Sequence, residues 1–301
     1  MSAPTSDRPI SPAPPAPADD GEQNPSALGT KKYWDDQYKL ELKNHASHGD
    51  IGEVWFGEQS ATKMVTWCKK TFIGEGDEDD PARSGLRVMD LGCGNGHMLF
   101  LMAAAGFTAL HGCDYSPAAV ELSRRLAAQI GLPVEVLSLP EAAPGSGSES
   151  ESESESESEP ESHDASDADE ADSPFDFDEE EEDNVRHSRL SLFRLDLLDA
   201  ASVQAHLDLA GGPFDIVLDK GTYDAISLNS PSARKLFIKH LPMLVSPSGG
   251  HFVITSCNWT TEELKEHFAA FEPVAVLPQR SFMFGGRSGQ NVSSVAFRVR
   301  A

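Results

Sequence analysis

Residues 86–96, LRVMDLGCGNG, are the stretch that decides the fold. The apolar run from Leu86 to Leu91 ends at alternating glycines, and HMLFLMAAAGF after it has the apolar spacing of a helix. The pattern predicts a strand, a tight glycine turn and a helix. Glycines at such a turn let a ligand lie against backbone N–H groups at the start of the helix, so we expect a nucleotide-like cofactor there.

The spacing of these glycines separates two classes of cofactor. Gly92, Gly94 and Gly96 form G-x-G-x-G, whereas the dinucleotide fingerprint G-x-G-x-x-G needs glycine at the position of His97. NAD is therefore disfavoured. Asp90, just before the turn, is well placed to meet a positively charged amino group of a different cofactor.

Alternating strand and helix patterns continue along the chain. ALHGCDYSPAAVELSRRL repeats the scheme, with a strand that ends near Asp114 and a helix that begins at Pro117. Further strands are expected at 191–196, 214–219 and 251–257, with a helix between the last two. Strands that alternate with helices predict an α/β fold, in which a mostly parallel sheet is covered by helices on both faces.

Two segments lack the apolar side chains that a packed core needs. Residues 1–27 are rich in Pro, Ala, Ser and Asp, and we expect a disordered tail. The domain expected over 28–301 is interrupted at about 140–187 by an acidic segment that contains SESESESESESE. We expect a disordered insertion that loops out, because the entropy of closing a loop rises only with the logarithm of its length. It is a solvated insertion, a target for phosphorylation of its serines, or a binding site for a basic partner.

The acidic insertion accounts for most of the formal net charge of −25. Between Glu141 and Asp183 there are twenty Asp and Glu and no Lys or Arg, which leaves 29 acidic and 24 basic residues elsewhere. That remainder is an ordinary soluble surface. It has no basic stripe and no aromatic residues interleaved with Lys and Arg, so we expect no direct binding of nucleic acid.

Cysteine usage and hydropathy indicate the compartment. The four cysteines show no Cys/His ligand spacing, so we expect no metal site and a reducing environment. No apolar run approaches the ~18 residues of a membrane span, and the N-terminus has no apolar signal core. We expect a cytoplasmic protein without a membrane partner, and the nucleus stays open as a second location.

Acidic residues at later strand ends are expected beside the glycine turn, because the carboxyl ends of parallel strands meet at one edge of the sheet. Asp114, about 20 residues after the turn, can accept hydrogen bonds from both hydroxyls of a ribose. Asp196 ends a later strand at the same crevice, where a contact to a base is expected. A helix N-cap would explain Asp196 equally well.

The motifs DLGCGNG, GCDYS, RLD and FDIVLD, in that order, are similar to those of the class I, seven-stranded S-adenosylmethionine-dependent methyltransferases. The resemblance implies a Rossmann-like fold, with a central seven-stranded, mostly parallel sheet, helices on both faces and an antiparallel last strand. It implies S-adenosylmethionine as the cofactor, held at its methionine end, ribose and adenine by residues after successive strands. These residues are Asp90, Gly92, Cys93, Gly94, Gly96, Asp114, Tyr115, Asp196, Leu197 and Asp219.

A narrower resemblance covers nearly the whole chain except the tail and the insertion. LGTKKYWDDQY, GDIGEVWFGE, LDKGTYDAISLN, ITSCNWTTEEL and SFMFGGRSG resemble the eukaryotic lysine methyltransferases of translation elongation factor 1-alpha. The resemblance implies a protein-lysine N-methyltransferase whose protein substrate is elongation factor 1-alpha, and we expect a monomer. The long acidic insertion departs from the family's shorter pattern.

The acceptor lysine is expected near the end of the strand at 214–219, where class I enzymes place residues that face the transferred methyl group. Asp219 and Tyr223 are candidates there to orient the amine and to help it lose its proton. Two other roles stay open, because Asp219 could cap the following helix and Tyr223 could belong to the core.

Further residues are candidates for binding the substrate. Trp55 and Phe56 could form an aromatic wall around the methylenes of the lysine, or pack in the core. Asn258 and Trp259 follow a strand at the functional edge. Arg287, in a glycine loop, could meet the substrate protein, or the loop could serve only as a turn.

Fold and cofactor do not by themselves identify the methyl acceptor. A small-molecule or RNA methyltransferase on the same fold stays open as an alternative. So does a non-catalytic scaffold that binds S-adenosylmethionine and recruits a basic partner through its acidic insertion.

Overall fold

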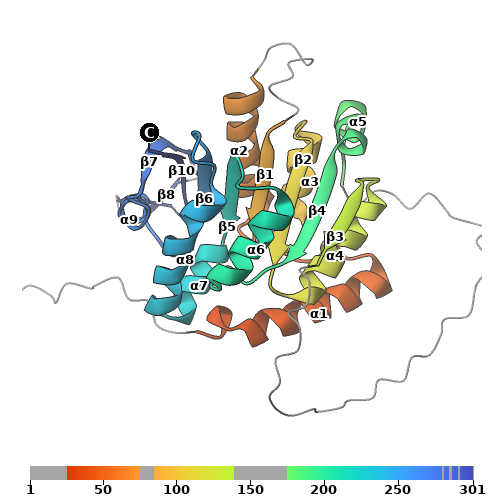
Figure 1. Ribbon diagram of the computed structural model, residues 1–301, viewed down its shortest axis with the longest axis horizontal. Coiled ribbons are helices and arrows are strands. Elements are labelled where there is room, and N and C mark those ends of the chain that lie inside the picture. Colours follow the sequence, from red (N-terminus) through yellow and green to blue (C-terminus); the bar gives the residue numbers. More distant parts are fainter. Residues whose placement is uncertain are drawn as a thin grey trace, which may run out of the picture.

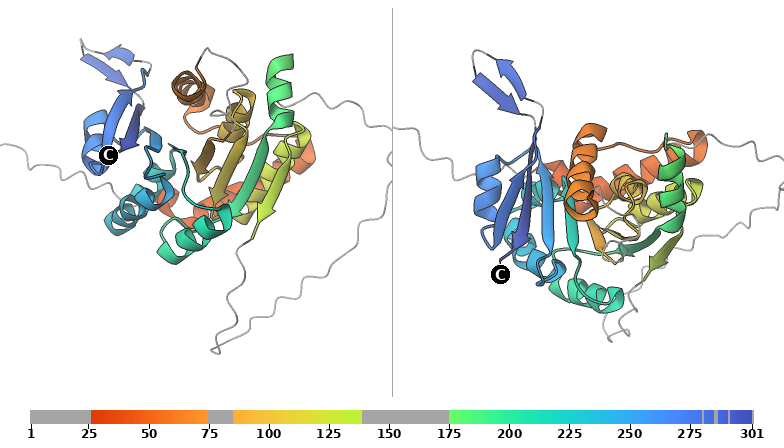
Figure 2. Two further views of the ribbon diagram at one scale, coloured as in Figure 1. Left: turned by 45° about the horizontal axis from the view of Figure 1, so that its top comes forward. Right: turned by 90° about the horizontal axis from the view of Figure 1, so that it is seen from above.

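The computed structural model describes residues 26–74, 85–138, 175–279, 281–284, 287–290 and 292–300. Within them one eight-stranded sheet has the order β3-β4-β2-β1-β5-β6-β10-β7, with helices on both faces (Figure 1). A separate hairpin projects from the C-terminal side of this sheet (Figure 2). Residues 1–25 of the expected tail and 139–174 of the expected insertion lie outside the described residues.

The strands and helices follow one another in alternation through most of the chain. The strands are β1 (Arg87–Leu91), β2 (Ala109–Asp114), β3 (Val134–Leu137), β4 (Arg189–Arg194), β5 (Ile216–Lys220), β6 (His251–Ser256), β7 (Phe271–Val276), β8 (Ser281–Phe284), β9 (Arg287–Gln290) and β10 (Ser293–Val299). The helices are the 3-10 turn η1 (Ala27–Gly29), α1 (Lys31–His48), α2 (Gly57–Cys68), the π-turn η2 (Lys69–Ile73), α3 (His97–Ala104), α4 (Pro117–Gln129), α5 (Glu179–His187), α6 (Ala200–Ala210), α7 (Thr222–Asn229), α8 (Pro231–Leu244) and α9 (Thr261–His267).

The pairing of the strands confirms the predicted fold class. β1 lies between β2 and β5 and is parallel to both, while the last strand, β10, is antiparallel to β6 and β7. The sheet has one strand beyond the expected seven. This is β3, which pairs with β4 at the sheet edge and leaves Val136 42% exposed, so it lacks the buried face that marks a strand in a sequence.

Both faces of the sheet are buried under apolar side chains. Successive residues of a strand point to opposite faces, so Val88 packs with α2, α3 and α4 on one face, while Met89 and Leu91 pack with α6, α8 and α9 on the other. Burial on both faces explains why the strands read as nearly continuous apolar runs.

The C-terminal end of the predicted insertion is ordered, so the predicted boundary near 187 was wrong. Residues 179–187 form α5, which begins with a capping box between Asp178 and Glu181 and buries Val185 completely. The glutamates that resemble low-complexity sequence occupy the first turn, where the helix dipole favours negative charge. A single buried valine and a capped end are too weak a pattern to separate this helix from the acidic run before it.

The carboxyl ends of the parallel strands meet along one edge of the sheet, and α1 runs beneath that edge in Figure 1. α1 packs against α4, and η1 packs against α7, so the N-terminal segment spans the edge from one side to the other. None of the described helices is long and apolar enough to cross a membrane.

Candidate functional site

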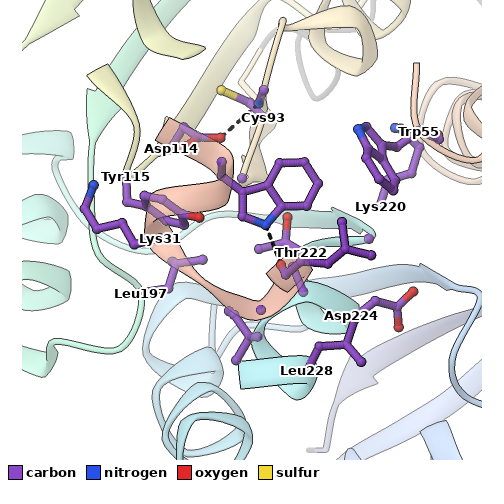
Figure 3. Close-up of a pocket in the computed structure, with 18 of the residues that line it drawn as sticks. Lys31, Trp55, Cys93, Asp114, Tyr115, Leu197, Lys220, Thr222, Asp224 and Leu228 are labelled. Carbon is purple, nitrogen blue, oxygen red and sulfur yellow. Dashed lines mark hydrogen bonds between the residues drawn. The ribbon is translucent and has the colours of Figure 1, made fainter. Parts of the chain in front are cut away.

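A pocket of about 230 Å³ opens at the carboxyl edge of the sheet (Figure 3). Its wall combines the glycine turn after β1, the residues that follow β2, β4, β5 and β6, the helix α7 and the N-terminal segment before and within α1. Residues far apart in the sequence therefore share one cavity. Figure 3 shows Asp114, Tyr115 and Lys31 on one side of it and Trp55, Lys220 and Asp224 on the other.

The glycine turn is fixed by its backbone and by its neighbours. Gly92, Gly94 and Gly96 all have positive φ, at 61°, 56° and 84°, a region that residues with a side chain rarely adopt. A Cβ at Gly92 would collide with Thr222, and one at Gly94 with the hydroxyl of Tyr38. Side chains from α7 and α1 thus pack against these two glycines on the side where a Cβ would lie, while Gly92 and Gly94 themselves form part of the pocket wall.

Asp114 connects the end of β2 to the glycine turn. Its carboxylate accepts hydrogen bonds from the backbone N–H of Gly94 at 3.2 Å and of Ser116 at 2.9 Å. Burial raises the pKa of Asp114 to about 6, although both N–H groups favour the ionised form. Asp114 lines the pocket, together with Cys93 and Tyr115, and their contact with a cofactor stays a prediction.

Asp90 lies at the end of β1, and only 4% of the residue is exposed. Burial raises its pKa to about 7, an effect that the nearby Lys220 ammonium opposes. Asp90 does not form part of the pocket wall, and neither does Gly96, whose Cα faces Ser123 and Phe100 instead.

The segment after β4 lines the pocket beside Tyr115. Asp196 is exposed and accepts a hydrogen bond from the backbone N–H of Leu198 at 2.9 Å, while Leu197 is buried. The alternative that Asp196 caps the next helix is excluded, because the N-cap of α6 is Asp199. Asp196 therefore lies on the pocket wall, where a contact to the adenine base was expected.

The N-terminal segment closes the pocket on the side opposite the sheet, and the sequence analysis missed it. Trp34 and Tyr38, one turn apart on α1, both line the cavity. The indole Nε1 of Trp34 donates to the carbonyl of Leu28 at 2.6 Å, and the amide of Asn229 on α7 donates to the carbonyl of Gly29 at 2.8 Å. Trp34 and Tyr38, four residues apart in KKYWDDQY, were the feature of the sequence that could have indicated this wall of the pocket.

Asp219 and Tyr223 do not line the pocket, which corrects the prediction that they face the transferred methyl group. Both are completely buried. The carboxylate of Asp219 accepts the backbone N–H of Tyr223 at 3.1 Å in the first turn of α7, whose N-cap residue is Gly221. The phenol of Tyr223 points into the core, where its oxygen lies 2.8 Å from Nδ1 of His267.

The sequence neighbours of Asp219 and Tyr223 line the pocket after β5 instead. Lys220, the last residue of β5, donates from Nζ to the carbonyl of Trp55 at 3.0 Å, and burial lowers its pKa. Asp224 on α7 lines the same end, with Asn258 after β6. The motif LDKGTYDAISLN contained Lys220 and Asp224, but sequence reasoning chose their neighbours.

Trp55 and Phe56 line the pocket, and their role as an aromatic wall around a lysine stays a prediction. Trp55 packs edge to face on Trp34, with ring centroids 5.0 Å apart. Phe56 has a left-handed backbone, with φ of 62°, which is uncommon for a residue with a side chain and places its ring beside Gly221 at the start of α7. The strained residue fixes the segment that carries both rings.

Two predicted substrate contacts lie elsewhere. Trp259 is 4% exposed and packs in the core against His267, with ring centroids 4.5 Å apart, so it does not reach the pocket. Arg287 begins β9, in the hairpin that Figure 2 shows projecting from the sheet. β9 pairs antiparallel with β8, and residues 285–286 of the predicted glycine loop lie outside the described part of the chain.

Comparison with known proteins identifies the family. Residues 82–138 match a family described as a methyltransferase domain. EEF1A lysine methyltransferase 2 of Homo sapiens is 34% identical over 94% of this chain and 91% of the relative, and that of Danio rerio is 32% identical over 91% and 88%. The chain belongs to the EEF1A lysine methyltransferase 2 family. The protein-lysine N-methyltransferase efm4 of Schizosaccharomyces pombe is 29% identical, over 91% of this chain and 94% of the relative.

Solved structures agree with the fold of this family. A SAM-dependent methyltransferase from Anabaena variabilis superimposes with a TM-score of 0.52 over 93% of this chain and 98% of the other, at 12% identity. S-adenosylmethionine is the cofactor of such an enzyme, and the pocket fits it: Asp114 and Asp196 on its wall offer acceptors for an adenosine, and Lys220 on its wall offers a cation close to the buried Asp90. No group of three or more His, Cys, Asp or Glu in the described ranges is placed to hold a metal ion.

Proposed function

We propose that this member of the EEF1A lysine methyltransferase 2 family is an S-adenosylmethionine-dependent protein-lysine N-methyltransferase that modifies elongation factor 1-alpha. The observation that carries the proposal is the likeness of 29–34% over at least nine-tenths of the chain to relatives named for this activity. The likeness extends through the acceptor end of the pocket as well as the cofactor end, because it is not confined to residues 82–138.

The adenosine half of the cofactor fits between the two strand ends that follow the turn. Asp114, from β2, would accept the ribose hydroxyls, and Asp196 and Leu197, after β4, would contact the adenine. Tyr115 lies between them, with the ammonium of Lys31 4.8 Å from the centre of its ring. This cation closes the adenosine end of the pocket without occupying it.

The methionine half would lie toward β5. An amino acid carries an ammonium and a carboxylate, and the chain offers one group of each opposite sign at this point, Asp90 and Lys220, which are close enough for each to shift the other's pKa. The bound cofactor supplies a methyl group on a sulfonium. The residues of the chain have to orient the incoming amine about 3 Å from that methyl and in line with the bond that breaks.

The acceptor end would take the aliphatic part of a lysine side chain between aromatic rings. Trp55 and Phe56 form one wall, and Asn258 supplies a polar group beside them. Apolar rings exclude water from the methylenes, while the terminal amine needs a polar partner. A lysine amine has an ordinary pKa of about 10.4 and must be neutral to attack, so the site has to remove its proton.

Three further features belong to the same proposal. The enzyme acts as a monomer on a protein substrate, makes no direct contact with nucleic acid, and works in the cytoplasm, with the nucleus as a second location. The nearly balanced charge outside the acidic insertion supports a surface that does not bind nucleic acid. Size-exclusion chromatography and light scattering would test the monomer.

Labelling in a cell lysate tests the acceptor. Purified protein with S-adenosylmethionine labelled on the methyl group is expected to label one protein of the size of elongation factor 1-alpha, and mass spectrometry of that protein is expected to find a methylated lysine. Transfer of label to RNA or to small molecules, with none in protein, would contradict the proposal.

A further inference from the structure

Asp224 is the carboxylate at the acceptor end of the pocket. Figure 3 shows it on the side of Trp55 and Lys220, away from Asp114 and Tyr115. The acidic residues on the pocket wall are Glu53, Asp114, Asp196 and Asp224. Asp114 and Asp196 lie at the adenosine end and Glu53 is exposed, so Asp224 is the buried carboxylate that remains for the acceptor.

Hydrogen bonds from the neighbouring strand end hold the carboxylate of Asp224. The hydroxyl of Ser256 donates to Oδ1 at 2.5 Å, and the backbone N–H of Cys257 donates to Oδ2 at 2.8 Å. The start of α7, which carries Asp224, is itself fixed, because Thr222 donates to the carbonyl of Leu91 at 2.6 Å. The position of the carboxylate is therefore set by β1 and β6 before any ligand enters.

A buried carboxylate without a cationic partner is unfavourable, and Asp224 has none among the described ion pairs. Asp224 is only 5% exposed. The two lysines on the pocket wall are engaged elsewhere, Lys31 with Asp35 at 2.6 Å and Lys220 with the carbonyl of Trp55. A cation that enters between the aromatic rings would supply the missing charge.

We propose that Asp224 binds the ammonium group of the acceptor lysine and takes its proton before methyl transfer, an inference that rests on the proposed function. One N–H bond of the ammonium breaks and an O–H bond forms on Asp224. The lone pair of the neutral amine then forms a bond to the methyl carbon, and the electron pair of the broken carbon–sulfur bond stays on sulfur. The proton on Asp224 passes to water when the methylated lysine leaves.

The groups around Asp224 suit this role. Burial raises the pKa of Asp224, against the hydrogen bonds from Ser256, Cys257 and Asn258, which makes it a better proton acceptor for an amine than an exposed aspartate. The other titratable groups near its carboxylate are Asp219 on β5, Tyr223 on α7 and Cys257 after β6, and Lys220 and Glu53 lie on the same pocket wall.

The variant Asp224→Asn separates charge from shape, because an amide of the same size can still accept the N–H of Cys257. Its affinity for S-adenosylhomocysteine, measured by calorimetry, is expected to stay within about twofold of wild type. Its turnover on the protein acceptor at pH 7 is expected to fall by at least ~100-fold, the usual range for losing a proton acceptor. The matched control is Asp208→Asn on α6, an exposed aspartate bonded to Gln204, which is expected to keep wild-type turnover.

The pH profile distinguishes proton removal from a structural role. The deficit of Asp224→Asn is expected to shrink as pH rises toward about 9.5, because a growing fraction of the lysine is already neutral in solution. A deficit that is the same at every pH, or turnover equal to wild type, would overturn the role of Asp224 while lysine labelling by wild type still supports the proposed function. A wild-type enzyme that labels no lysine would contradict the proposed function, and the role of Asp224 with it.

Discussion

Lys220 and Trp55 are joined by a hydrogen bond from the ammonium of the first to the carbonyl of the second, at 3.0 Å. Lys220 ends β5 and Trp55 precedes α2, so the bond ties the N-terminal segment to the centre of the sheet. An ammonium can donate three hydrogen bonds, and this one leaves two for a ligand. The aromatic wall and the proposed methionine site therefore share one lysine.

The variant Lys220→Met is expected to lower the affinity for S-adenosylhomocysteine by about 10- to 100-fold, the loss typical of one hydrogen bond to a charged group. Its affinity for 5′-methylthioadenosine, which lacks the amino acid end, is expected to stay unchanged. Calorimetry with both ligands measures the difference, and Lys235→Met, on the exposed side of α8, serves as the control. An equal loss for both ligands would assign Lys220 a role only in placing Trp55.

The affinity for S-adenosylhomocysteine is expected to fall as pH is lowered below about 7. Burial raises the pKa of Asp90 to about 7 and of Asp114 to about 6, and the ligand groups that we assign to them favour the ionised carboxylates. Below these values the protein must lose a proton to bind, which weakens binding by up to about tenfold per pH unit for each carboxylate. Calorimetry between about pH 8 and 5.5 tests this. In Asp90→Asn the decrease in affinity near pH 7 is expected to disappear. An affinity that does not change with pH would contradict both assignments.

The variant Tyr223→Phe is expected to keep its methyltransferase activity within about twofold of wild type. The phenol oxygen lies 2.8 Å from His267 in the core and away from the pocket, so its removal costs about 1 kcal/mol of stability instead. Initial rates and urea unfolding measure the two effects. A loss of turnover with stability unchanged would show that Tyr223 takes part in the reaction.

The stability of the fold is expected to fall as pH drops from about 6.5 toward 4. His206 is 1% exposed, neither of its ring nitrogens has a hydrogen-bond partner among the described residues, and burial lowers its pKa to about 4. The unfolded chain, with an ordinary pKa near 6.5, binds the proton first, so acid favours unfolding in this window and the effect is absent above it.

Urea unfolding at about pH 7.5 and pH 5 measures this effect. In His206→Phe the difference in free energy of unfolding between the two pH values is expected to be about 2 kcal/mol smaller than in wild type. His187→Phe, at an exposed position on α5, is expected to leave the difference as it is. Equal pH dependence in His206→Phe and wild type would show that folding does not lower the pKa of His206.

Sequence reasoning was most successful where the signal is local. The glycine turn, the strand that ends at Asp114 and the helix that begins at Pro117 depend on periodicity and on backbone conformations that neighbouring residues dictate. The mostly parallel arrangement could be predicted because strands joined by helices pair in parallel, whereas the strand order comes from the structure. β3 and α5 were missed because each buries too little apolar surface to give a pattern.

By itself, then, the sequence determined the α/β fold, the edge of the sheet where the pocket opens and the place of Asp114 beside the glycine turn. Only the tertiary structure decided which residues of LDKGTYDA face the pocket. Consecutive residues of a helix point about 100° apart, so Tyr223 enters the core while Asp224 lines the cavity, and no local pattern distinguishes them. The partners that decide it, Ser256, His267 and Trp55, are brought to α7 and β5 by packing across the whole chain.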